Sequence, residues 1–344
     1  MMNRPLKVAA SLKAAPWGGQ ALREKLNKPL PEGEKIGESW ELSTLEQGPS
    51  RVSEGEFTGM RLGAVLTRFG KKAVGSEAAQ KGVELPLLVK FLDAQGKLSV
   101  QVHPDETAAR ALGGAAKTEA WYVVDCKPDA QLVYGLKPGT GAEDFRRAIE
   151  RGQVQDVLEW IPVKPGDVLF VPAGLVHALG EGILVYEIQQ SSDTVYRVYD
   201  WDRKNPDGSS RELHISQALQ SVKTGAAPRV GAGGPTLQTE GATRTLLAAC
   251  KAFALEKLEV ESALEMETDG TRFYAMTLLE GTGKLCFEEG EMDLEVGETV
   301  YIPADLGAYT VKGKVNGLLG YVPSLDRLRA AFGPQADQVP GMEV

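Results

Sequence analysis

Two histidines, a glutamate and a glutamine carry the chemistry that this sequence can support. The chain of 344 residues has three histidines, His103, His177 and His214. Gln101 and His103 are two residues apart in an expected strand, so their side chains point to one face. Glu119 follows sixteen residues after His103, just before another expected strand. Two imidazoles, a carboxylate and an amide oxygen can form the first coordination shell of a divalent transition metal, with positions left for water or substrate.

The sequence motifs around these residues, called phrases below, are more informative than the spacing of the two histidines. A single histidine is more often a surface or core residue than a ligand, and His177 lies 74 residues after His103. The sequence reads Gly-x4-Gln-x-His from Gly96 to His103 and Gly-Asp-x4-Pro-x-Gly-x2-His from Gly166 to His177. Together these phrases resemble the two halves of a cupin motif, with Gln101 in place of the usual first histidine and the glutamate displaced by an Ala-rich insertion. A cupin is a small jelly roll that holds its metal inside the barrel.

Short β-rich runs between turn residues predict a mainly β fold. The chain has 39 Gly and 19 Pro, and short strands separated by Gly, Pro and Asp are typical of a sandwich or barrel. Helices are expected at 105–113 and 142–160, as insertions between strands. The expected strands are 85–92, 97–103, 120–125, 130–136, 167–172, 183–190, 194–201, 273–281, 283–290, 298–304 and 317–323.

These runs fall into two cupin-type jelly-roll β-modules. Residues 1–220 are predicted to form a catalytic, metal-binding cupin module with helical insertions at about 104–116 and 140–160. Residues 221–243 are rich in Gly, Ala, Pro and Thr, which indicates a linker. Residues 244–344 are predicted to form a degenerate cupin-like module without metal ligands.

One phrase occurs in both modules. Gly, an acidic residue, four strand residues and Pro-Ala follow each other at 166–173 and again at 297–304. His177 aligns with Ala308. This similarity suggests a duplicated β-fold in which the second copy is chemically silent.

Charge and cysteine content exclude several classes of function. The formal net charge is −9, from 38 Lys+Arg and 47 Asp+Glu, so binding to nucleic acid or to an anionic membrane is not expected. The three cysteines are widely spaced and without a C-x-x-C motif, which indicates reduced thiols. No apolar run approaches the roughly 20 residues of a membrane helix. We expect a cytoplasmic protein that acts on a small molecule, as a monomer or small homo-oligomer.

The chain resembles type I mannose-6-phosphate isomerase (phosphomannose isomerase), in its short bacterial form. The resemblance covers residues 17 to about 201, and its motifs are specific only when taken together. The matching segments are Trp17–Gly19, Ile36–Ser43, Leu87–Leu92, Leu98–Pro104, Lys117–Tyr122, Pro172–Gly174 with His177–Leu179, and Glu187–Asp193 with Tyr196–Val198.

The resemblance implies one zinc ion per chain, bound by His103, Glu119, His177 and Gln101. It implies interconversion of mannose 6-phosphate and fructose 6-phosphate, a step of carbohydrate metabolism, and places the catalytic arginine of the family at Arg197. The second module has lost the histidine of its motif, so the resemblance implies a structural role for it.

An aldose–ketose isomerisation moves a proton between C2 and C1 through a cis-enediolate. A bound metal can stabilise the oxyanion. Arg197 stays protonated and cannot be an ordinary base, so its expected role is electrostatic. Glu187, on the strand that leads toward Arg197, is the leading candidate for the base; a metal-bound hydroxide and His177 remain open as alternatives.

The phosphate of the substrate needs cations and hydroxyl donors. Lys117 is two residues before Glu119 and is expected on the same face, near the metal. Lys90 and Ser99 match family positions that line the phosphate end. A lysine is most often a solvated surface residue, so these assignments compete with that simpler reading. His214 is expected at a helix entry with Ser216 as the cap.

Two other functions stay open. The first is a metal cupin that does oxidative chemistry with iron or manganese, against which Gln101 and the Lys/Arg set argue. The second is a non-catalytic sugar-binding cupin, against which the presence of Arg197 and of all metal-ligand types argues. Metal analysis with oxygen-uptake assays tests the first, and a coupled assay with mannose 6-phosphate tests the second.

Overall fold

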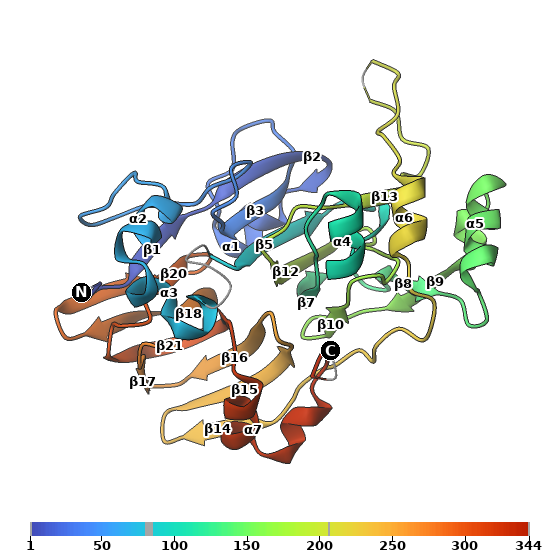
Figure 1. Ribbon diagram of the computed structural model, residues 1–344. Helices are drawn as coiled ribbons and strands as arrows, with labels where there is room; N and C mark the ends of the chain where they lie inside the picture. Colours follow the sequence, from blue (N-terminus) through green and yellow to red (C-terminus); the bar gives the residue numbers. More distant parts are fainter. Residues whose placement is uncertain (1, 80–84, 206, 343–344) are drawn as a thin grey trace.

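The computed structural model describes residues 2–79, 85–205 and 207–342 and contains three β-sheets (Figure 1). The strand pairs among these residues are antiparallel, which confirms the expected mainly β fold. The outer limits of the two predicted modules, residues 1 and 344, lie outside the described residues. No helix in the described ranges is long and apolar enough to cross a membrane.

Two of the sheets are built from residues 11–199, within the first predicted module. The six-stranded sheet has the order β10 (Val168–Val171), β7 (Glu119–Cys126), β12 (Ile183–Gln190), β5 (Leu87–Ala94), β3 (Ile36–Leu42) and β2 (Ser11–Gly19). The five-stranded sheet has the order β13 (Tyr196–Tyr199), β6 (Val100–Val102), β11 (His177–Ala178), β8 (Gln131–Leu136) and β9 (Leu158–Pro162).

The third sheet belongs mainly to the second module. Its order is β14 (Thr236–Thr239), β15 (Ala242–Ala249), β16 (Ala254–Val260), β21 (Ala308–Tyr321), β18 (Tyr274–Phe287), β20 (Thr299–Ile302), β1 (Leu6–Ala9) and β4 (Arg51–Val52). β17 (Ala263–Glu267) pairs with β21, and β19 (Gly290–Leu294) pairs with β18. The expected strands 273–281 and 283–290 are joined in β18, which bends at a bulge near Leu278 without ending.

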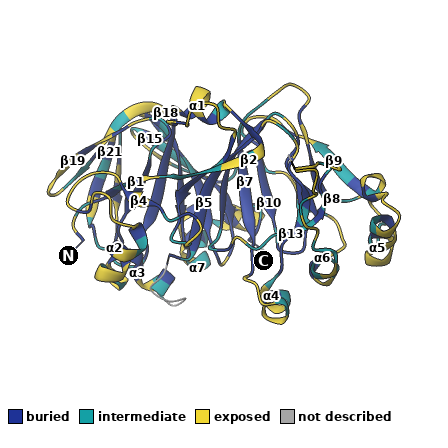
Figure 2. Cartoon of the chain, turned by 90° about the horizontal axis from the view of Figure 1, so that it is seen from above, coloured by how far each residue is buried: buried dark blue, intermediate teal, exposed yellow. Residues whose placement is uncertain are grey.

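The helices lie outside the sheets; in Figure 2, α2, α3, α4 and α6 lie along the lower edge and α1 lies at the opposite edge. α4 and α5 fall within the two expected insertions, and a 3₁₀ turn at Val154–Val157 follows α5. The expected helical stretch 142–160 is too long, because β9 begins at Leu158. The helices are α1 (Ala21–Leu26), α2 (Leu62–Phe69), α3 (Lys71–Ala79), α4 (Glu106–Leu112), α5 (Ala142–Glu150), α6 (Ile215–Ser221) and α7 (Leu325–Phe332), with a final 3₁₀ turn at Pro334–Gln338.

The first strands of the chain cross between the modules. β1 pairs with β20 of the second module (Figure 1), and β4 pairs with β1. β14 forms within the stretch 221–243 that was predicted as a linker. The division at residues 220 and 243 stays a prediction, and the sheets show that β1 and β4 lie across it.

The repeated phrase has the same local structure in both modules. It leads into β10 in one copy and into β20 in the other. The Asp167 carboxylate accepts from the backbone N–H of Lys164 at 2.9 Å, and the Glu298 carboxylate accepts from that of Glu295 at 3.0 Å. Both turns hold a glycine at positive φ, Gly166 in the first and its counterpart in the second. The shared geometry supports the duplication inferred from the sequence.

One hydrophobic core joins the outer face of the six-stranded sheet to the second module. Phe91, Tyr186 and Ile188 contribute from the first module, and Phe253 and Leu318 contribute from the second. The alternation along β12 then turns Glu187 and Gln189 to the other face. That inner face carries the candidate site.

Candidate active site

His103, Glu119 and His177 form a buried cluster whose ligand atoms lie within 4.8 Å of one another. His103 directly follows β6, Glu119 is the first residue of β7, and His177 is the first residue of β11. Each histidine Nε2 is 3.4 Å from a Glu119 carboxylate oxygen. The structure therefore brings together three of the four predicted metal ligands, which come from three strands of two sheets.

The outer nitrogen of each imidazole is held by a backbone carbonyl. His103 Nδ1 lies 2.9 Å from the Thr194 carbonyl oxygen, and His177 Nδ1 lies 2.9 Å from the Leu175 carbonyl oxygen. A carbonyl only accepts, so each Nδ1 carries the proton and each Nε2 presents its lone pair to the cluster. Metal-binding histidines are typically oriented in this way.

Charges around the cluster favour the protonation states that bind a metal. Burial and the Lys117 ammonium lower the pKa of His103 to about 3, and burial lowers the pKa of His177. Burial alone would raise the pKa of Glu119, but Lys117, 2.7 Å away, and His103 hold it well below its usual range. The site thus offers two neutral imidazoles and a carboxylate, the forms that bind divalent transition metals.

The two Nε2 atoms are buried and have no hydrogen-bond partner among the described residues. Buried polar atoms normally have a partner, so this cluster is a candidate for a cation. The donor set fits a divalent metal, and it does not by itself specify zinc. In the described ranges, it is the only group of three or more His, Cys, Asp or Glu side chains that could hold a metal ion.

Gln101 and Arg197 lie on the sheet face that carries His177. Gln101 is directly opposite His177 in the β6–β11 pair and directly opposite Arg197 in the β6–β13 pair. Residues directly opposite each other on antiparallel strands share a face. This register places Gln101 as expected for a ligand, while its bond to a metal stays a prediction.

Arg197 is anchored by the segment that leads into α6. Its Nη1 donates to the Glu212 carbonyl at 2.7 Å, and its backbone N–H donates to His214 Nδ1 at 3.2 Å. His214 occupies the N-cap position of α6, so the expected helix entry is confirmed. Ser216 is not the cap, because it lies inside the first turn.

Glu187 is buried beside the cluster and is held by Trp121 and Lys117. The Trp121 indole N–H donates to Glu187 Oε2 at 2.7 Å, and Lys117 Nζ lies 3.8 Å from Glu187 Oε1. Burial and the Glu119 charge raise the pKa of Glu187 to about 7, against the opposing effect of Lys117 and Lys90. A carboxyl group with a pKa near neutrality is suited to general acid–base chemistry.

Lys90 is surrounded by three carboxylates. Its Nζ is 3.2 Å from Glu38, 3.7 Å from Asp193 and 3.9 Å from Glu187, and it lies over the Trp40 ring. The Glu38 and Asp193 side chains are 25% and 38% exposed, whereas Lys90 is 5% exposed. Lys90 therefore lies between the buried Glu187 and the more open part of the site.

Glu38, Asp193 and the Thr194 carbonyl were not among the site residues predicted from the sequence. Glu38 and Asp193 both lie in segments quoted for the family resemblance, and that is the one signal that could have found them. Ser99 is buried immediately before β6, two residues before Gln101. Its predicted contact with a phosphate stays a prediction.

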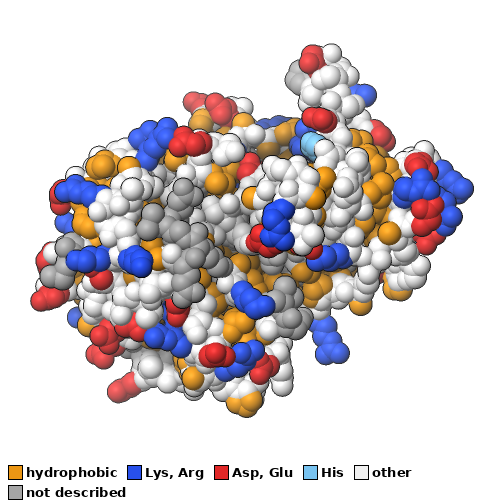
Figure 3. Space-filling view, in the orientation of Figure 1, with side chains coloured by type: hydrophobic (Ala, Val, Ile, Leu, Met, Phe, Trp, Pro, Cys, Tyr) orange, Lys and Arg blue, Asp and Glu red, His pale blue; other side chains and the backbone are white. Residues whose placement is uncertain are grey.

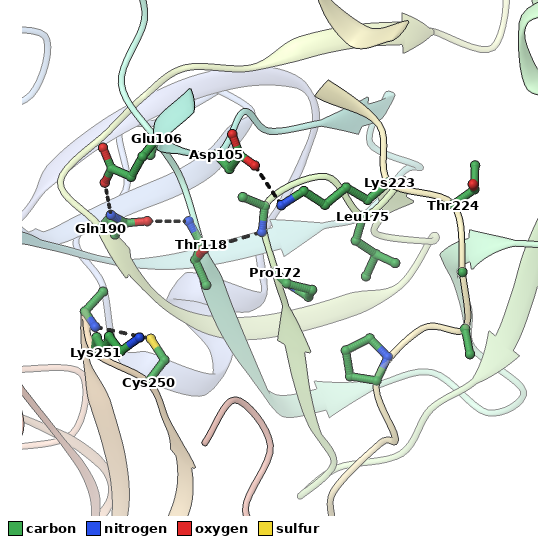
Figure 4. A pocket seen from close by; sticks show the side chains of 16 residues that line it. Asp105, Glu106, Thr118, Pro172, Leu175, Gln190, Lys223, Thr224, Cys250 and Lys251 are labelled. Atoms are coloured by element: carbon green, nitrogen blue, oxygen red, sulfur yellow. Dashed lines mark hydrogen bonds and ion pairs between the residues drawn. The ribbon is translucent and has the colours of Figure 1, made fainter. Parts of the chain in front are cut away.

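A separate cavity of about 600 Å³ has none of the three cluster residues in its lining (Figure 4). It is lined by Thr118, Gln190 and Leu175, together with residues of the stretch 223–228 and of 250–252 in the second module. Thr118, which stands between Lys117 and Glu119 in the chain, lines this cavity. The Asp105–Lys223 ion pair of 2.7 Å lies at its edge. This cavity is not the space in front of the candidate ligands.

Comparisons with known proteins agree over nearly the whole chain. Phosphomannose isomerase type I, catalytic domain, matches residues 6–146, and mannose-6-phosphate isomerase, cupin domain, matches residues 242–321. The chain is 33% identical over 324 residues to mannose-6-phosphate isomerase ManA of Bacillus subtilis, which covers 94% of this chain and 100% of that protein. It is also 33% identical to mannose-6-phosphate isomerase of Streptococcus mutans, over 91% of this chain and 96% of that protein.

A solved structure shows the same fold. The crystal structure of mannose 6-phosphate isomerase from Bacillus subtilis aligns with a TM-score of 0.84 at 33% identity, over 92% of this chain and 99% of that chain. A likeness of this extent in sequence and fold confirms the resemblance found in the motifs. The chain belongs to the family of type I mannose-6-phosphate isomerases, which are aldose–ketose isomerases.

Proposed function

We propose that the chain is a zinc-dependent enzyme that interconverts mannose 6-phosphate and fructose 6-phosphate through a cis-enediolate. The observation that carries this proposal is the position of Glu187, with its pKa of about 7, next to the His103–Glu119–His177 cluster. His103, Glu119, His177 and Gln101 would hold the metal. When bound, the metal supplies positive charge close to the substrate oxygens.

Glu187 moves the proton between C2 and C1 in this proposal. Its ionised form accepts the proton from one carbon and its protonated form returns it to the other, so a pKa near neutrality serves both steps. Lys117 stays charged because Glu119 and Glu187 lie beside it. Its charge keeps Glu119 ionised and offsets the negative charge that develops on the substrate.

Arg197 contributes charge and does not exchange protons. Its guanidinium is fixed by the Glu212 carbonyl, so it can present a preorganised cation to the opened sugar. We assign substrate binding to Lys117, Lys90 and Ser99. Lys90 lies nearest the open side, among the partly exposed carboxylates Glu38 and Asp193.

The test is an isomerase assay on metal-replete protein together with elemental analysis. We expect turnover of mannose 6-phosphate and one zinc per chain. His103→Ala should lose metal and activity together. Arg197→Ala should keep the metal and lose about 10²–10³ in kcat, the typical cost of removing a preorganised charge.

Two results would count against the proposal. Metal-loaded parent protein without turnover would contradict the assigned reaction. Arg197→Ala with turnover within a few-fold of the parent would contradict the role given to this residue. Arg211→Ala is a matched control, since Arg211 pairs with Asp200 at the same end of the module.

A further inference from the structure

Gln189 is a fully buried amide on the inner face of the six-stranded sheet. In the register of β12 and β7 it lies opposite Glu119, so both side chains emerge on the face of the cluster. Its Nε2 donates to two backbone carbonyls, that of Gln190 at 2.9 Å and that of Ser192 at 2.5 Å. Carbonyls accept only, so these contacts fix the orientation of the amide.

These bonds hold a short segment, residues 190–194, which we call the anchoring loop. The Ser192 hydroxyl donates to the Ala115 carbonyl at 3.0 Å and accepts from the Thr194 backbone N–H at 3.2 Å. The Ala115 backbone N–H donates to the Thr194 hydroxyl at 3.1 Å. The anchoring loop is thereby connected to the segment that leads to Lys117 and Glu119.

The anchoring loop delivers two groups to the site. The Thr194 carbonyl is the partner of His103 Nδ1, at 2.9 Å. The Asp193 carboxylate lies 3.7 Å from Lys90 Nζ. One loop thus orients a candidate metal ligand and places a counter-charge beside a candidate substrate-binding lysine.

We propose that Gln189 is a positioning residue that sets the orientation of His103 and the place of Asp193 together, by clamping the anchoring loop. This inference rests on the proposed function, because the His103 orientation matters only for a metal. Partners of metal-bound histidines typically change metal affinity by about 10- to 100-fold when they are lost. Gln189 acts one step further out, through the loop that supplies such a partner.

The test uses Gln189→Met, which keeps the length of the side chain and removes both donors. We expect the affinity of the protein for Zn²⁺, measured in competition with a chromophoric chelator, to fall by up to about 10-fold, the lower end of the range for a direct partner. The visible absorption of the Co²⁺-substituted protein should change, because the His103 imidazole is no longer held. We also expect kcat for mannose 6-phosphate to fall.

Tyr186→Phe is the matched control. Tyr186 lies on the same strand, and its ring packs in the core shared with the second module. This variant also removes a buried polar atom, and its Zn²⁺ affinity and Co²⁺ spectrum should equal those of the parent. A purely structural effect of substitutions in β12 would change both variants alike and would overturn the proposal.

Ser192→Ala tests the loop without touching the amide. It removes the hydroxyl bonds to Ala115 and Thr194 and keeps the carbonyl that Gln189 binds, so we expect a smaller loss of Zn²⁺ affinity in the same direction. A folded Gln189→Met protein with Zn²⁺ affinity within about twofold of the parent would overturn the proposal. If Gln189→Met does not fold, Ser192→Ala with unchanged affinity and spectrum would overturn it instead.

These readings are separable from the proposed reaction. Zn²⁺ affinity and the Co²⁺ spectrum are measured without substrate. A parent protein that binds zinc and does not turn over mannose 6-phosphate would contradict the proposed function. The effect of Gln189→Met on Zn²⁺ affinity could still be measured and interpreted. A parent protein that binds neither metal would overturn both.

Discussion

Opposing effects act on the protonation of Glu187. Burial and the Glu119 carboxylate favour its neutral form, whereas Lys117, Lys90 and the Trp121 N–H favour its ionised form. The resulting pKa of about 7 is therefore a balance that a single neighbour can shift. As a base, Glu187 is active when ionised, so kcat/KM should fall as the pH drops below this pKa.

Trp121→Phe should move that acid limb to higher pH. The variant keeps an aromatic ring and removes the N–H that stabilises the ionised Glu187 at 2.7 Å. Loss of a hydrogen bond to a charged group is worth about 1.5 kcal/mol, or about one pKa unit. The measurement is the pH profile of kcat/KM. Trp160→Phe, on β9, is the control and should leave the profile unchanged; an identical acid limb in Trp121→Phe and the parent would refute the assignment.

Helix α4 is the element that spans the chain between His103 and Lys117. Its first turn is capped by Asp105, whose carboxylate accepts from the backbone N–H groups of Thr107 and Ala108. It ends at Gly113, which adopts the left-handed conformation that favours glycine (φ 77°). A helix of seven residues gains little from its own propensity, so these end contacts set where the following segment enters β7.

Asp105→Ala should lower the free energy of unfolding by about 1 kcal/mol, the usual cost of losing an N-cap. Asp105→Asn keeps the cap and loses the ion pair with Lys223, so it should lower the free energy of unfolding by only a few tenths of a kcal/mol. The Ala108 N–H and Lys223 lower the pKa of Asp105. Its stabilisation is therefore fully present above the ordinary carboxyl pKa and is lost as the pH falls from there through the lowered pKa of the folded protein. Denaturant unfolding at pH 7 and at about pH 3 checks both points, and equal effects of the Ala and Asn variants would contradict the capping role.

At the scale of the whole molecule, a buried ionic network joins the two modules. Lys28 Nζ contacts the Glu41 carboxylate at 2.6 Å and the Gly297 carbonyl at 2.5 Å. Glu41 also accepts from the Thr299 hydroxyl at 3.1 Å and from the Ser39 hydroxyl at 2.6 Å. On the face drawn in Figure 3, charged side chains of both signs are interspersed.

Glu41→Ala should destabilise the protein by about 3–5 kcal/mol, because it leaves the buried Lys28 without its counter-charge. Glu46→Ala is the matched control, since Glu46 pairs with Arg61 in an exposed ion pair that is worth about 0–1 kcal/mol. The measurement is the free energy of unfolding of both variants in urea, and a much larger loss in Glu41→Ala than in Glu46→Ala would confirm the prediction. Similar small losses in the two variants would show that the network contributes little.

The sequence was informative where local pattern and chemistry coincide. The strands next to His103 and at Glu119 were predicted within a few residues, because each is a short β-rich run bounded by turn residues. The two-residue strand β11, which begins at His177, was not predicted. The neighbours of Lys90 were not predicted. Glu38 and Asp193 reach it only through the pairing of β3 with β5 and through the anchoring loop, and long-range register leaves no trace in local pattern.

The pairing of β1 could not be predicted for the same reason, because it is a long-range contact. No strand was predicted at residues 6–9, and nothing in these four residues identifies β20, almost three hundred residues later, as the partner of β1.

That pairing makes the halves of this protein mutually dependent. A protease cut in the exposed stretch between α6 and β14 would sever the backbone yet leave β1 hydrogen-bonded inside the opposite half. A fragment expressed from residue 244 onward would lack β1, so β20 would become an unpaired edge strand that is prone to aggregation. The two modules therefore depend on each other for folding, because the C-terminal module binds the N-terminal strand β1 in its own sheet.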